Sequence, residues 1–174
     1  MIIKIMGGAL TILSGAIIGL YFAHRDGFRA GALLEIKKAL IELTSEIEYS
    51  LSSLPEALTN VAGRRGQRAV NLLFAEAGKR LSAGGTSVSE AWEAALRSAF
   101  AGTSLLTPED TENIAALGRS LGRADRGLQI KSIALTEDYI DARLSELAET
   151  SAKNKRLYSG LGVLAGLLAV IVML

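Results

Sequence analysis

The stretch that decides the fold is residues 125–174, DRGLQIKSIALTEDYIDARLSELAETSAKNKRLYSGLGVLAGLLAVIVML. Its first half, Gly127–Ala152, places apolar residues at helical spacing with charged residues between them. No proline interrupts the stretch, so we expect one continuous helix of about 75 Å, at about 1.5 Å per residue. The predicted apolar stripe of this first half consists of Ile133, Ile140, Leu144 and Leu147.

The second half of the same helix is typical of a membrane segment. Lys153, Lys155 and Arg156 form a basic collar, and the eighteen residues of 157–174 that follow carry no charge. A hydrocarbon core of roughly 30 Å needs a run of about this length. We therefore predict that 157–174 is a C-terminal transmembrane helix that continues the last helix of the soluble domain.

A second uncharged segment, residues 5–23, predicts an N-terminal transmembrane anchor over residues 1–23. A cleaved signal peptide is the competing interpretation, but the apolar run is long and no small-residue cleavage pattern precedes His24 and Arg25. Both anchors have glycines four residues apart, which either allow close helix packing in lipid or reflect how common glycine is in membrane helices. These glycines are Gly15, Gly19, Gly162 and Gly166.

The charged residues lie almost entirely between the two anchors. Residues 24–156 hold 18 of the 19 Lys and Arg residues and all 18 Asp and Glu residues. A domain this close to neutral lacks the basic surface that nucleic-acid binding needs. The basic residues that flank both anchors lie on the side of this segment, so the positive-inside rule predicts that residues 24–156 form a cytoplasmic domain. The two anchors would then enter the membrane from the same side.

The strongest helical pattern of the central segment is Leu33–Leu51, where apolar residues recur every three or four positions. The pattern favours packing within a bundle, and a coiled-coil oligomer is the alternative. The predicted core residues here are Leu33, Ile36, Leu40, Leu43 and Ile47.

Three further helices are predicted from their start signals, a Ser or Thr cap followed by a first-turn proline or an acidic residue three positions on. These signals are Ser53 with Pro55, Ser87 with Glu90, and Thr107 with Pro108. A fourth helix is predicted from its apolar face, and the four cover 55–62, 66–82, 88–100 and 108–121. We interpret Trp92, Leu117 and Leu121 as core residues.

No segment alternates between apolar and polar residues for long enough to predict a strand. The predicted fold class is therefore all-α, with a bundle of about six helices between an N-terminal and a C-terminal transmembrane helix.

Residue types that carry catalysis are scarce. The chain has no cysteine and one histidine, His24, which excludes disulfides, thiolate chemistry and the common zinc sites. Glu109, Asp110 and Glu112 could be imagined as a carboxylate cluster, but acidic residues at a helix start are explained by the helix dipole. We predict no catalytic, cofactor-binding or metal-binding residues, and no cofactor.

Arg64, Arg65 and Arg68 form a small basic patch around a pair of glycines. Its ordinary interpretation is a solvated turn, and its functional interpretation is a docking surface for an acidic partner. These arginines and the exposed face of Leu33–Leu51 are the candidate docking residues.

Several short motifs occur along the chain in a specific order and spacing. They are Glu46–Tyr49 before Leu54–Leu58, Ala91–Leu96, Leu117-Gly118 with Leu121-Gly122 and Asp125, and Ala152–Asn154 before Leu161-Gly162 and Leu164–Leu168. With the charge-poor N-terminal anchor and the total length, this series resembles the stage III sporulation protein AB family of endospore-forming bacteria.

The resemblance implies a soluble domain similar to that of the F-type platform proteins of type II secretion. It implies a place in a mother-cell complex that joins the mother cell to the engulfed forespore and includes a secretion-type ATPase. The implied partners are the other proteins of that complex, the ATPase included, and membrane lipid. The implied location is the mother-cell (outer forespore) membrane, with the domain facing the mother-cell cytoplasm. Platform proteins carry two such domains and this chain carries one, so self-association could replace the missing half.

Two functions from different classes follow. The leading one is a non-enzymatic platform subunit of this channel complex, which couples the ATPase to membrane and ring components. The alternative is a small pore-forming or holin-like membrane protein whose helical domain regulates assembly. The uncharged membrane segments favour the first, since a water-filled path usually keeps polar or ionisable residues.

Overall fold

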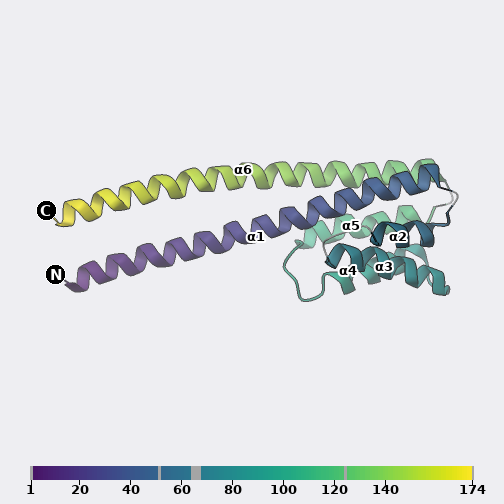
Figure 1. The fold of residues 1–174 in the computed structure, drawn as a ribbon, viewed down its shortest axis with the longest axis horizontal. Coiled ribbons are helices and arrows are strands. Elements are labelled where there is room, and N and C mark those ends of the chain that lie inside the picture. Colours follow the sequence, from purple (N-terminus) through teal and green to yellow (C-terminus); the bar gives the residue numbers. More distant parts are fainter. Residues whose placement is uncertain (1, 51, 64–67, 124, 174) are drawn as a thin grey trace. The chain divides into compact units, whose positions relative to one another are not determined.

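The computed structural model describes the backbone of residues 2–50, 52–63, 68–123 and 125–173, and the side chains of 25–50, 52–63, 68–123, 125–151 and 153. All regular secondary structure within these residues is helical, which confirms the all-α fold class (Figure 1). The helices are α1 (Ile2–Tyr49), α2 (Leu54–Ala62), α3 (Arg68–Ala83), α4 (Val88–Ala99), α5 (Pro108–Leu121) and α6 (Arg126–Met173).

The chain divides into two compact units. Met1–Phe28 and Ser145–Leu174 form the first, and Arg29–Leu144 forms the second, which holds the helical bundle. Where side chains are described, no helical stretch combines the length and apolarity needed to cross a membrane. The two predicted anchors and their candidate packing glycines lie outside those residues: 1–23, 157–174, Gly15, Gly19, Gly162 and Gly166.

The helices of the bundle begin where the capping signals predict. At the start of α4, the Glu90 N–H donates to Ser87 Oγ at 3.3 Å, and the Ser87 N–H donates to Glu90 Oε2 at 3.0 Å. At the start of α2, the Ser53 N–H donates to Glu56 Oε2 at 2.9 Å. Because these hydrogen bonds satisfy N–H groups that a helix start leaves unpaired, the boundaries are set by local sequence.

The glycines that end helices differ in why they are needed. Gly84 and Gly85 follow α3 with φ of +75° and +81°, a conformation that other residues adopt only with strain. Gly122 ends α5 with φ of −76°, which any residue can adopt. A Cβ at Gly122 would lie 3.2 Å from the Cβ of Val88, so its small size serves the packing of α5 against the start of α4.

Trp92 occupies the centre of the bundle. Its side chain is 1% exposed, its Nε1 donates to the carbonyl oxygen of Ile114 at 2.8 Å, and its ring meets Phe74 edge-on with centroids 5.4 Å apart. The ring thus joins α3, α4 and α5. The other predicted core residues that are buried are Leu33, Ile36, Leu40, Leu43, Ile47, Leu117, Leu121, Ile133, Ile140 and Leu147.

Leu144 departs from the predicted core, because it is only half-buried. The buried residues Ile133, Thr136 and Ile140 of α6 step by three and then four positions. Continuing this spacing by three positions reaches Arg143, not Leu144. Leu144 therefore lies at the rim of the apolar stripe.

Candidate functional site

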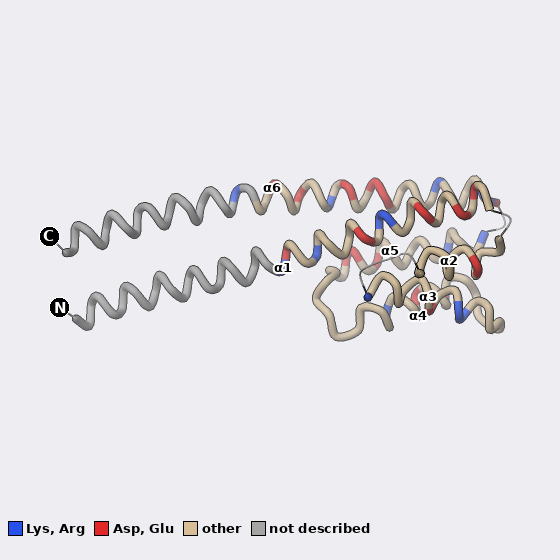
Figure 2. Tube along the Cα trace, viewed as in Figure 1, with Lys and Arg blue, Asp and Glu red and all other residues tan. Residues whose placement is uncertain are grey.

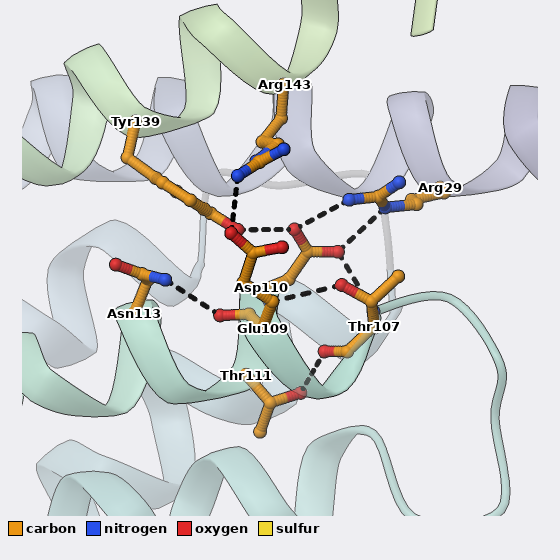
Figure 3. Close-up of polar contacts among 8 residues, drawn as sticks. All are labelled: Arg29, Thr107, Glu109, Asp110, Thr111, Asn113, Tyr139 and Arg143. Carbon is orange, nitrogen blue, oxygen red and sulfur yellow. Dashed lines mark hydrogen bonds and ion pairs between the residues drawn. The ribbon is translucent and has the colours of Figure 1, made fainter. Parts of the chain in front are cut away.

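The most extensive polar cluster of the described residues lies at the start of α5 (Figure 3). Its centre is Asp110, whose side chain is completely buried. Arg29 reaches it from α1, and Tyr139 reaches it from α6. A buried carboxylate costs several kcal/mol unless it is paired and hydrogen-bonded, so its partners decide what it can do.

Both oxygens of Asp110 are fully engaged. Oδ2 accepts from Arg29 Nε at 2.7 Å and from the Thr107 N–H at 2.9 Å. Oδ1 accepts from Arg29 Nη2 at 2.9 Å and from the Tyr139 hydroxyl at 3.0 Å. The arginine is held in the bidentate geometry that makes such pairs strong. Each carboxylate oxygen has about two acceptor positions, so these contacts use them all.

These contacts set the protonation of the cluster. Burial by itself would raise the pKa of Asp110, but hydrogen bonds from Arg29, Thr107 and Tyr139 outweigh it and lower the pKa to about 2. The hydrogen bond to Asp110 raises the pKa of Arg29, against the effect of burial. The pair is therefore ionised at any physiological pH.

A second ion pair supports the tyrosine. Arg143 of α6 pairs with Glu109, the neighbour of Asp110, and its guanidinium lies 5.2 Å from the centroid of the Tyr139 ring. Figure 3 shows the two pairs side by side between α5 and the long helices. Both ion pairs lie within the unit Arg29–Leu144, so they fasten α1 and α6 to the same end of α5.

The arrangement suits structural work rather than chemistry. A carboxylate that stays ionised, with every acceptor position filled, has no position free for a substrate proton or a cation. Within the part of the chain that the structure describes, no group of three or more His, Asp and Glu side chains could hold a metal ion. The cluster is best described as a clamp that holds three helices together.

In the sequence alone, Asp110 is explained only by its place at a helix start. That local role is present, because the Thr107 N–H donates to its carboxylate. The tertiary role was missed, since Arg29 lies 81 positions away and Tyr139 lies 29 positions away. No spacing pattern in a single sequence marks such a pair.

The predicted basic patch is described only in part. Arg64 and Arg65 lie outside the described residues, and Arg68 is exposed at the first residue of α3. Arg68 lines a shallow groove of about 520 Å³ between α2 and α3, whose apolar lining includes Ala62 and Leu72. Its docking role stays a prediction.

The outer face of α1, the other predicted docking surface, carries exposed apolar residues. Leu34 is 42% exposed and Ile41 is 46% exposed. Between them, Lys37 Nζ lies 2.6 Å from both carboxylate oxygens of Asp141 on α6. This face is therefore both apolar and charged.

The described residues thus form an all-α bundle in which the buried carboxylate of Asp110 joins three helices. The sequence pattern of the family described as Stage III sporulation protein AB matches residues 4–174, so the chain belongs to that family of sporulation proteins. Stage III sporulation protein AB of Bacillus subtilis (strain 168) is 28% identical over 172 residues, which cover 99% of each chain. A solved structure of Stage III sporulation protein AB matches 72% of this chain and 97% of its own, with a TM-score of 0.65 and 27% identity.

Proposed function

We propose that this chain is a non-enzymatic membrane platform subunit of the complex that joins the mother cell to the forespore. In this role it couples a cytoplasmic secretion-type ATPase to the membrane and ring components of that complex. The observation that carries the proposal is the match of residues 4–174 to a sporulation family. It is supported by a bundle in which the buried carboxylate of Asp110 is paired with Arg29. Such a domain works through what it contacts.

The proposed membrane arrangement rests on the charge pattern of the sequence. Residues 1–23 and 157–174 would be the two anchors, and the glycine pairs Gly15–Gly19 and Gly162–Gly166 would let them pack closely. The domain between them would face the mother-cell cytoplasm, since the basic flanks lie on that side. The protein would then reside in the outer forespore membrane.

The proposed contact with the ATPase includes Arg64, Arg65 and Arg68. Reversing all three to Glu should reduce capture of the ATPase by the full chain about tenfold or more, because like charges across an interface repel. The measurement is a quantitative pull-down from sporulating cells, with the melting temperature of each variant as a check on folding.

Reversal of Lys79, Arg119 and Arg123 is the matched control. These three residues are also exposed, and reversing them changes the net charge by the same amount. Unchanged capture by the first triple variant, or equal loss in both, would remove the basic patch from the proposed contact.

A further inference from the structure

Within the unit Arg29–Leu144, the outer faces of α1 and α6 meet at the pair Lys37–Asp141, and we call the surface on either side of this pair the furrow. There α1 and α6 run antiparallel, side by side (Figure 1). The pair Lys37–Asp141 spans them. Leu34 and Ile41 lie three positions before and four positions after Lys37, which is the spacing of one helix face. Both leave more than two fifths of their surface exposed, at 42% and 46%.

The antiparallel register shows which residues of α6 are level with them. Counting back three positions on α1 corresponds to counting forward three positions on α6, because both helices rise equally per residue. Leu34 is therefore level with Leu144, and Ile41 is level with Glu137. Leu144 is half-buried and lies three positions after Asp141, so it stands at the edge of both the apolar stripe and this surface. The two exposed apolar residues of α1 are one heptad apart, about 10 Å along the axis.

The α6 side of the furrow is acidic. Glu137 and Asp138 precede Asp141 by four and three positions, and Figure 2 shows acidic residues along both long helices. Burial raises the pKa of Glu137, and the carboxylates of Asp141 and Asp138 add to this although Lys37 opposes it. The nearby Lys38 already donates to Glu35 at 2.8 Å. The acids of this face thus outnumber the cations around them.

We propose that this furrow binds an amphipathic helix of a partner protein, with apolar residues seven positions apart and Lys or Arg residues on its flanks. Apolar side chains of such a helix would cover Leu34, Ile41 and the rim residue Leu144, and its basic flank would meet Glu137 and Asp138. The inference rests on the proposed platform function, and it adds the chemistry of one partner.

Charge argues for a foreign partner over a second copy of this chain. A two-fold contact brings the same patch of both copies together. Here that contact would place the Glu137 and Asp138 carboxylates of one copy near those of the other, and like charges at an interface repel. A basic helix has no such penalty.

The test uses the full chain and two synthetic peptides. Both peptides carry leucines seven positions apart, and they differ only in having Lys or Glu residues on the flanks. Fluorescence anisotropy should show that the Lys peptide binds about tenfold tighter, and that the preference fades with added salt. Leu34→Asp and Ile41→Asp should each weaken binding about tenfold. The double variant Glu137→Gln, Asp138→Asn should erase the preference between peptides.

Leu72→Asp is the matched control, because Leu72 of α3 is also 42% exposed and lies away from the furrow. It should leave peptide binding within about twofold of the wild type. The proposal would be overturned if both peptides bind equally well, or if L34D and L72D lose peptide binding to the same extent. The proposal would also be overturned if the chain self-associates, L34D abolishes that self-association, and neither peptide binds. That result would assign the furrow to a second copy.

Capture of the ATPase by the wild-type chain separates this inference from the proposed function. If the Lys peptide fails to bind while the wild-type chain still captures the ATPase, the furrow proposal is wrong and the platform role stands. If the peptide binds as expected while the chain recruits no ATPase, the furrow stands and the platform role is wrong.

Discussion

The carboxylate of Asp110 accepts one hydrogen bond from the backbone of Thr107 and three from side chains of α1 and α6. At the scale of single residues, this makes Asp110 unlike the other capping residues. Glu90 caps α4 and is exposed to solvent, whereas Asp110 caps α5 and is completely buried. Removing one member of a buried ion pair leaves the other charge uncompensated, which commonly costs about 3–5 kcal/mol.

Asp110→Asn is therefore expected to destabilise the bundle by about 3 kcal/mol, because the amide presents an N–H group to positions already filled by donors. Chemical unfolding of the full chain measures this change. Asp141→Asn is the control, since the pair Lys37–Asp141 is exposed and should contribute less than about 1 kcal/mol. A similar loss in both variants would contradict the clamp role of Asp110.

The same residue predicts a pH dependence. The pKa of folded Asp110, about 2, is below the value of about 3.9 for an unfolded aspartate. Its contribution is then fully present above about pH 4 and is lost as the pH falls towards 2. The wild-type chain should lose this part of its stability over that window, and D110N should not show it. If the free energy of unfolding of the two proteins changed with pH in the same way, the low pKa assigned to Asp110 would be contradicted.

At the scale of helices, one close contact joins α4 and α5. A Cβ added at Gly118 would lie 2.8 Å from Cδ1 of Trp92. The indole cannot move aside easily, because its Nε1 is bonded to the Ile114 carbonyl and its ring packs on Phe74. The distance between the two helices is therefore set by the absence of a side chain at Gly118.

Gly118→Ala should destabilise the bundle by about 1–3 kcal/mol through overpacking, although alanine favours helix formation by about 1 kcal/mol. The melting temperature of the full chain reports the result. Gly31→Ala on α1 is the matched control, since no heavy atom lies within 4 Å of its added Cβ. That variant should be as stable as the wild type or more stable. A G118A protein with a raised melting temperature would show that the indole can shift.

At the scale of the whole molecule, the proposed orientation can be tested because the natural chain has no cysteine. A single Ala134→Cys variant, at an exposed position of α6, should react with a membrane-impermeant maleimide only once the mother-cell cytoplasm is opened. An Ile3→Cys variant should stay unlabelled when only the mother-cell cytoplasm is opened. Labelling of the Ala134 variant from outside intact cells would contradict the proposed orientation.

Much of the fold could be predicted because its signals are local. The boundaries of α4 and α5 follow from Ser87 and Thr107, which bond to groups three residues away. The core residues of α1, from Leu33 to Ile47, follow from a spacing that any helix would share. These features depend on a few neighbouring residues, and a single sequence contains them in full.

The candidate sites depended on contacts between distant segments. The sequence by itself determined that the bundle is helical, where α2, α4 and α5 start, most of the buried faces and the family to which the chain belongs. Only the tertiary structure decided that Arg29 and Tyr139 meet Asp110, that Trp92 meets Gly118, and that Lys37 meets Asp141. The physical reason is that caps and helical spacing act within one or two turns, whereas an ion pair or a close helix contact depends on which helices pack together and in what register.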